Sequence, residues 1–269
     1  MLHPPILMHL ARALRAVVGR ELNKFLRQPS RLASSLVRPL LWFVVFSAGF
    51  HNVFGVAIIA PYETYVDYKE YMLPGLLGMI ALFNGMQSSL SMVYDREMGS
   101  MKTLLVSPLP RSFLLTSKLL AGAMISVIQA TVFLLIAAAY GIEIPAIGFL
   151  TVLPALILSG LMLGALGLML SSFIKQLENF AGVMNFVIFP MFFLSSALYP
   201  LWRIQESNPT LAFLASYNPF TAAVELIRFA LYGHFNLNAA LITLFSLLFF
   251  LGMAIWGYNP SQGMMNRRA

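Results

Sequence analysis

The chain has 269 residues, 59% of them hydrophobic and only 10% charged, which excludes a soluble globular protein because such a domain needs about a quarter charged residues. Its formal net charge of +7 does not indicate nucleic-acid binding, since the basic residues lie between long apolar runs, where they would meet a membrane surface. With no cysteine, the chain has no disulfide, no thiolate metal site and no cysteine nucleophile.

The first predicted element is an amphipathic helix over residues 6–28. Its apolar side chains recur at helical spacing, and most of its basic side chains fall on other faces, which is typical of a helix in the membrane interface. Simple anchoring to lipid explains the same pattern. Pro29 is expected to end this helix, and residues 30–32 to turn the chain into the membrane. The candidate interfacial contacts are Arg20, Glu21, Lys24 and Arg27.

Six apolar segments are long enough to cross the hydrocarbon core of a bilayer, which takes about 20 residues. Because backbone inside lipid must satisfy its own hydrogen bonds, each segment is predicted to be an α-helix. The sequence therefore predicts an all-α polytopic membrane protein, with residues 1–269 forming a single transmembrane domain. The segments cover residues 36–54, 73–93, 119–140, 149–173, 181–201 and 238–257.

The basic residues predict the orientation of these spans. All but three of the 17 lie at or before the start of the first span, between the second and third, between the fourth and fifth, or after the sixth. The exceptions are Lys69, Arg203 and Arg228. Because cytoplasmic loops are enriched in Lys and Arg, both ends of the chain and the loop 95–118 are predicted to be cytoplasmic. An even number of spans also requires both ends to share a side.

The cytoplasmic loop between the second and third spans is polar for this chain. Gly99 allows a bend, and Pro108 and Pro110 stop a helix, so residues 100–106 could form a short helix with Leu104 and Leu105 on one side. Such a helix can transmit force as a rigid lever. A solvated connector is the alternative, and the residues alone favour it.

Residues 211–233 are apolar enough to suggest a seventh span, but they contain Asn218, Pro219, Glu225 and Arg228. An ionisable group at the bilayer centre costs at least about 2.5 kcal/mol. We expect two short extracellular helices, broken at Asn218-Pro219 and re-entering the outer leaflet, with Glu225 and Arg228 neutralising each other one turn apart. An amphipathic helix lying flat on the membrane surface is the alternative.

Two sets of residues within the spans are candidates for packing or for a substrate route. Gly160, Gly164 and Gly167 form a small-residue face, which suits close helix packing within one chain or between two copies. Polar side chains form a stripe on the second span and are scattered on the third and fifth. They could line a substrate route, although interhelical hydrogen bonds explain most of them. They are Asn84, Gln87, Ser88, Ser89, Ser91, Gln129, Asn185, Ser195 and Ser196.

Several kinds of site are absent from the sequence. It lacks a phosphate-binding P-loop, a zinc-binding HExxH motif and a hydrolase nucleophile elbow, and its four histidines do not cluster at the spacing of metal ligands. We therefore expect no catalytic residue and no metal site. No predicted span carries a charged residue near its centre, which argues against an ion-coupled carrier.

Residues 94–118 read YDREMGSMKTLLVSPLPRSFLLTSK, and this stretch resembles the cytoplasmic loop of type-2 ATP-binding-cassette (ABC) transporter permeases, especially drug and lipid exporters. Lys102 and Thr103 depart from the family pattern, which often has an acidic residue there. Residues 25–40 and 217–233 resemble the entry helix and the extracellular segment of the same family. Ser100 replaces a common threonine of the family conservatively. The matching loop positions are Asp95, Arg96, Glu97, Gly99, Leu104, Leu105, Val106, Ser107, Pro108, Arg111 and Lys118.

The resemblance implies that this chain is the permease subunit of an exporter in a bacterial or archaeal cytoplasmic (inner) membrane. Two permease copies, expected to be a homodimer, would form the pathway, together with membrane lipid. ATP and Mg²⁺ would bind a separate ATPase subunit, so this chain needs no cofactor. The loop 95–111 would dock a coupling helix on that ATPase, with the N-terminal helix beside it. The cargo would be amphipathic: a drug, a lipid or a lipid-linked glycan.

Two other functions remain open at this point. A membrane scaffold or assembly protein without transport of its own would share the composition and the spans. An intramembrane enzyme is disfavoured, because no acid–base pair or nucleophile constellation is present in the sequence.

Overall fold

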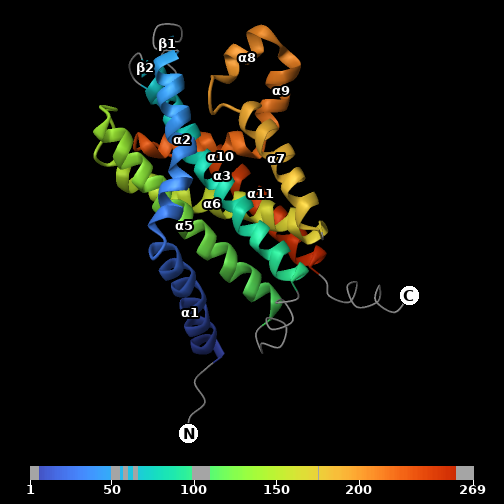
Figure 1. Ribbon diagram of the computed structural model, residues 1–269. Coiled ribbons are helices and arrows are strands. Elements are labelled where there is room, and N and C mark those ends of the chain that lie inside the picture. Colours follow the sequence, from blue (N-terminus) through green and yellow to red (C-terminus); the bar gives the residue numbers. More distant parts are fainter. Residues whose placement is uncertain are drawn as a thin grey trace.

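The computed structural model describes residues 6–49, 55–56, 60–62, 66–98, 110–174 and 176–258 (Figure 1). This part of the chain is an assembly of helices with one two-stranded antiparallel ribbon, β1 (Gly55–Val56) and β2 (Val66–Asp67). The helices are α1 (Ile6–Leu26), α2 (Pro29–Gly49), α3 (Tyr68–Glu97), α5 (Arg111–Ala139), α6 (Gly148–Phe173), α7 (Leu177–Phe193), α8 (Leu201–Ser207), α9 (Pro209–Tyr217), α10 (Pro219–Leu231) and α11 (Leu237–Gly257). The all-α prediction is therefore confirmed.

Five of these helices, α2, α3, α5, α6 and α11, are long and apolar enough to cross a membrane. They correspond to the first four predicted spans and the last one. The remaining predicted span, 181–201, overlaps α7, which has 17 residues, begins before it at Leu177 and ends at Phe193. The described residues thus support five of the six predicted spans, and α7 is a shorter apolar helix.

The early end of α7 has a visible cause. The chain turns after Leu194, and the side-chain amide of Asn218 donates hydrogen bonds to the carbonyls of Met191 (2.7 Å) and Leu194 (2.6 Å). The last carbonyls of a helix need partners outside the helix. Asn218 supplies them from the segment between α9 and α10, so the chain can leave the helix there without losing hydrogen bonds.

The start of α2 differs from the sequence prediction. Residues 30–32 were expected to form a connection, but α2 already begins at Pro29. Proline is well suited to the first position of a helix, because its missing N–H would have no partner there and its fixed φ is helical. The predicted start of the span at residue 36 was therefore late, and Arg38 lies next to the midpoint of α2 rather than at its edge.

The centre of the molecule is α6, which packs against α3, α5, α10 and α11. Burial is uneven: 67% of the α3 span lies inside the protein, but only 17% of the α2 and α11 spans. The outer faces of α2 and α11 are therefore left for lipid or another chain. In Figure 1, α10 runs across these long helices, and ten of its 13 residues are buried. A helix lying flat on the outside would not be buried in this way.

The small-residue face of α6 packs within the chain. A Cβ atom on Gly164 would lie 2.6 Å from Leu119 of α5, and one on Gly167 would lie 2.9 Å from the carbonyl oxygen of Gly85 on α3. Gly160 lies against Ala123 of α5 at an ordinary contact distance of 3.6 Å. Of the two interpretations of these glycines, the structure places them in contacts inside one chain.

Candidate functional site

A cavity of about 590 Å³ opens between α2, α3, α5 and α7. Its apolar wall includes Met79, Ile80, Phe83 and Leu90, and within the described part of the chain its only charged lining residue is Arg38. The polar wall is formed by Ser34, Ser35, Asn84, Gln87, Ser91 and Gln129. The cavity therefore offers both hydrogen-bonding groups and apolar surface to a bound molecule.

The wall of the cavity is stiffened by a hydrogen bond between two spans. The side-chain amide of Asn84 on α3 donates to the side-chain oxygen of Gln129 on α5. Gln129 is buried, so this pairing satisfies a polar group that would otherwise be costly within apolar helices. The amide pair thus joins α3 to α5 while remaining part of the surface that a bound molecule would meet.

The polar stripe of the second span divides in two. Asn84, Gln87 and Ser91 face the cavity, as does Gln129 from α5. Ser89 instead donates to the carbonyl of Gly85 in its own helix. The interhelical interpretation therefore holds for Asn84, which also lines the cavity, whereas Ser89 bonds within its own helix. A substrate route along the stripe stays a prediction.

The end of α3 is joined to the start of α7 by Glu97. Its carboxylate accepts a hydrogen bond of 3.1 Å from the backbone N–H of Leu177, the first residue of α7. The first N–H groups of a helix have no partner within it, and a negative charge at this end is favourable. Leu177 also lines the cavity. One contact therefore connects the beginning of the loop after α3 to the cavity wall.

The other loop candidates are only partly described. The side chains of Asp95, Arg96 and Arg111 lie outside the described residues, although their backbones belong to the end of α3 and the start of α5. Gly99, Ser100, Leu104, Leu105 and Pro108 lie outside the described residues altogether, and with them the predicted short helix.

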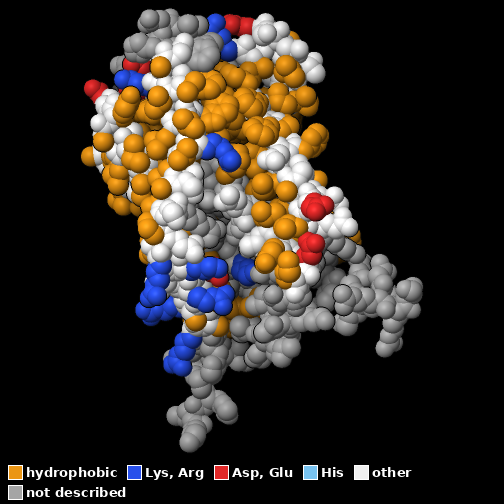
Figure 2. All heavy atoms as spheres, viewed as in Figure 1, with side chains coloured by type: hydrophobic (Ala, Val, Ile, Leu, Met, Phe, Trp, Pro, Cys, Tyr) orange, Lys and Arg blue, Asp and Glu red, His pale blue; other side chains and the backbone are white. Residues whose placement is uncertain are grey.

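The amphipathic helix α1 packs on the bundle through its apolar face. It contacts α5 and α2, and Val18 and Phe25 are buried there. Its charged residues stay outside: Arg20 forms an exposed ion pair with Glu21 (3.1 Å), and Lys24 and Arg27 are also exposed. On the face shown in Figure 2, basic side chains gather at this lower end, below a belt of hydrophobic side chains.

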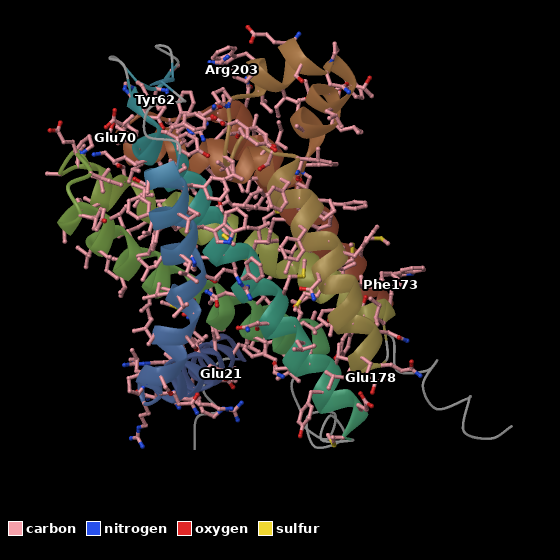
Figure 3. All side chains as sticks on the ribbon, turned by 45° about the horizontal axis from the view of Figure 1, so that its top comes forward. Glu21, Tyr62, Glu70, Phe173, Glu178 and Arg203 are labelled. Carbon is pink, nitrogen blue, oxygen red and sulfur yellow. The ribbon has the colours of Figure 1, made fainter. Side chains whose placement is uncertain are left out.

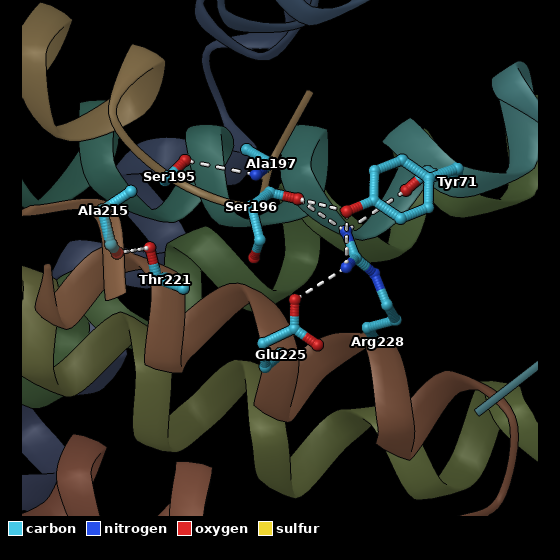
Figure 4. Close-up of polar contacts among 8 residues, drawn as sticks. All are labelled: Tyr71, Ser195, Ser196, Ala197, Ala215, Thr221, Glu225 and Arg228. Carbon is cyan, nitrogen blue, oxygen red and sulfur yellow. Dashed lines mark hydrogen bonds and ion pairs between the residues drawn. The ribbon is translucent and has the colours of Figure 1, made fainter. Parts of the chain in front are cut away.

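A second polar cluster lies around Arg228 of α10 (Figure 4). One guanidinium nitrogen of Arg228 donates to Glu225 (2.7 Å) and to the hydroxyl of Tyr71 (3.0 Å), and another donates to the carbonyl of Ser196 (2.8 Å). The Tyr71 hydroxyl donates to the same carbonyl at 3.0 Å. The expected pairing of Glu225 with Arg228 is present, within a larger network than the sequence suggested.

The network ties three elements together. Arg228 is 3% exposed, and its charged group also lies 4.0 Å from the centre of the Tyr71 ring. It fixes α10 to α3 and to the turn that follows α7. Tyr62 and Tyr232 pack beside it with ring centres 4.8 Å apart. Burial raises the pKa of both hydroxyls, that of Tyr232 to about 12, so both stay neutral at physiological pH.

Asn218 and Pro219 start α10. The side-chain oxygen of Asn218 accepts from the N–H of Phe220 at 2.9 Å, and Pro219 occupies the first helical position. The predicted break into two short helices at this point is seen in α9 and α10. Because the other side-chain atom of Asn218 holds the end of α7, one residue both begins one helix and closes another.

Comparison with known protein families decides the assignment. The family model of the ABC-2 type transporter matches residues 12–232, which is most of the chain. The chain belongs to the ABC-2 type transporter family. It is similar to the ycf38 transport permeases of Cyanophora paradoxa (30% identical, covering 81% of this chain and 73% of the relative) and Pyropia yezoensis (28%, 85% and 77%). It is also similar to the multidrug ABC transporter permease YbhR of Escherichia coli K12 (33%, 62% and 45%).

As an ABC-2 permease, the chain is a multi-pass membrane subunit of a transporter and is not itself an enzyme. Membership of the family implies pairing with an ABC ATPase subunit. In this light the Glu97 contact and the cavity are the candidate functional features of the permease, whereas the Arg228 network joins α10 to α3 and to the turn after α7.

Sequence reasoning missed three residues of the permease. Arg38 was counted only as a basic residue that orients the first span, because the span was predicted to start too late. Tyr71 and Gly85 carried no signal of their own, since their roles depend on Arg228 and Gly164, which are distant in the sequence. A longer first span, starting directly at Pro29, would have placed Arg38 near its centre.

Proposed function

We propose that the permease is the membrane half of an ATP-driven exporter, and that the loop 95–111 docks on the separate ATPase subunit. The observation that carries the proposal is the contact of Glu97 with Leu177. A movement of the ATPase against the loop would displace the end of α3, and the hydrogen bond would pass this movement to α7. Because Leu177 lines the cavity, the displacement would reach the wall that a substrate touches.

In the proposed orientation, the end of the bundle that carries Glu97 and the loop 95–111 lies in the cytoplasm. Figure 3 shows Glu21 and Glu178 at one end of the bundle and Tyr62, Glu70 and Arg203 at the other. The end with Glu21 also carries the basic residues of α1, which suits a cytoplasmic surface with anionic lipid. Both termini of the chain would then be cytoplasmic, in the inner membrane of the cell, and α8 and α9 would face outside.

The proposed substrate is amphipathic, in the class of drugs, lipids and lipid-linked glycans. The mixed wall of the cavity supports this class, because both apolar and hydrogen-bonding residues line it. We further propose that two permease copies face each other across the pathway. The exposed side chains of Leu41 on α2 and Phe186 on α7 are available to such a partner.

Purification with the ATPase subunit tests this function. We expect a complex of two permease and two ATPase chains whose ATP hydrolysis rises when the permease is present. Replacing Glu97 by glutamine removes the charge that holds Leu177, and it should lower permease-stimulated hydrolysis several-fold. Glu178→Gln is the matched control, because Glu178 lies in the first turn of α7, next to Leu177, and is exposed.

The control should behave as the wild type. Equal stimulated hydrolysis in the Glu97→Gln and wild-type complexes would contradict the coupling route. A permease that stays isolated, with no ATPase subunit bound, would instead favour the scaffold function.

A further inference from the structure

Arg38 places a positive charge where the helix around it is apolar. It lies next to the midpoint of α2, with the exposed side chains of Val37 and Leu41 on the same helix. A charged side chain inside a membrane span is costly, and such residues usually face a cavity or a partner. Arg38 does line the cavity, which explains where its charge points but leaves open what balances it.

The described surroundings of Arg38 supply an aromatic contact and no negative charge. Its guanidinium carbon lies 3.9 Å from the centre of the Phe83 ring, so the flat face of the cation rests on an apolar wall. The N–H groups of a guanidinium point outward in its plane, away from a ring stacked on its face. Within the described ranges, no carboxylate lines the cavity and none forms an ion pair with Arg38.

We propose that Arg38 binds the anionic head group of an amphiphile, a phosphate, carboxylate or sulfate, whose apolar chain lies along Met79, Ile80 and Leu90. A planar guanidinium fits such an oxyanion with paired hydrogen bonds. The Phe83 ring orients the guanidinium and excludes water from one side of it. This inference rests on the proposed function and narrows its substrate class: the cavity selects anionic amphiphiles and disfavours cationic ones.

The test measures binding to the full-length permease in phosphatidylcholine nanodiscs, without nucleotide. The probe is a dansylated undecanoic acid, compared with its uncharged methyl ester. We expect the wild type to bind the acid at least about ten-fold more tightly than the ester, which corresponds to about 1.4 kcal/mol. Arg38→Gln should bring both affinities to the level of the ester, and Arg38→Lys should keep part of the preference, because it keeps the charge but loses the planar fork.

Arg203→Gln is the matched control. Arg203 also lies over an aromatic ring, 4.7 Å from the centre of Trp202, but at the other end of the molecule and outside the cavity. The Arg203→Gln variant should therefore keep the wild-type preference for the acid over the ester. Binding of the ester to Arg38→Gln shows that this variant is folded. A wild type without preference for the acid, or an Arg38→Gln protein that keeps it, would overturn the proposal.

Further arms identify the source of the anion and separate this inference from the proposed function. If phosphatidylglycerol in the nanodisc displaces the acid, the ligand is a membrane lipid head group; if it does not, the ligand is a freely diffusing amphiphile. Both results support the anion site. Binding is measured without ATP, so the two proposals can fail separately. A wild type that shows no preference for the acid but still exports substrate with ATP would contradict only the anion site. A permease that prefers anions but binds no ATPase would contradict only the exporter.

Discussion

Arg228 shows how one buried cation can organise the end of a membrane protein. Its partners come from α10, α3 and the turn after α7, so its charge is balanced by Glu225, and its two terminal nitrogens also donate to Tyr71 and Ser196. The pairing of Glu225 with Arg228 could be predicted from their spacing on a helix. The role of Tyr71 could not, because 157 residues separate it from Arg228.

Removing Arg228 should destabilise the permease strongly. Arg228→Met leaves Glu225 without its cation and the carbonyl of Ser196 without its charged donor, and we expect a loss of about 3–5 kcal/mol in the free energy of unfolding. Denaturant unfolding in detergent micelles, followed by circular dichroism, measures this loss. The double variant with Glu225→Met should recover part of it, because no unpaired charge then remains. Arg203→Met, which removes an exposed arginine, should cost far less; equal losses would refute the structural role of the network.

At the scale of elements, hydropathy located five spanning helices, and one proline and one distant asparagine explain where the prediction failed. Pro29 was taken as a stop but is the first residue of α2, and α7 ends early because Asn218 supplies partners for its last carbonyls. The sequence also indicated the small-residue face of α6. It could not indicate that Gly85 of α3 is the partner of Gly164, since hydropathy does not reveal which helices cross.

The crossing of α3 and α6 should be sensitive to a single methyl group. A Cβ atom on Gly85 would lie 2.8 Å from the backbone nitrogen of Gly164, so Gly85→Ala must push two helices apart. We expect a loss of about 1–3 kcal/mol, read as a lower thermal unfolding midpoint of the purified permease. Gly252→Ala on α11 is the control, because its Cβ would meet nothing within 4 Å. Should both variants melt like the wild type, the close α3–α6 contact would be wrong.

For the whole molecule, the two ends have different characters. One end holds the basic surface of α1, the Glu97 contact and the cavity, and the other holds the buried Arg228 network. The charge bias of the sequence indicated this polarity, but not the contact between Glu97 and α7, because nothing in a sequence tells which helix start lies near a given carboxylate. We infer that one end responds to the ATPase and that the other stays fixed.

The most direct test of the proposed coupling is the accessibility of the cavity during the ATPase cycle. The chain has no cysteine, so a single Gln87→Cys substitution places one reporter in the exposed cavity wall. The permease–ATPase complex is treated with a water-soluble maleimide, without nucleotide and after trapping with ATP and vanadate, with Asn238→Cys at the exposed start of α11 as the control. We expect trapping to slow labelling at residue 87 at least several-fold and to leave residue 238 unaffected, and we expect Glu97→Gln to abolish the difference. Equal labelling of residue 87 in both states would contradict the proposed coupling.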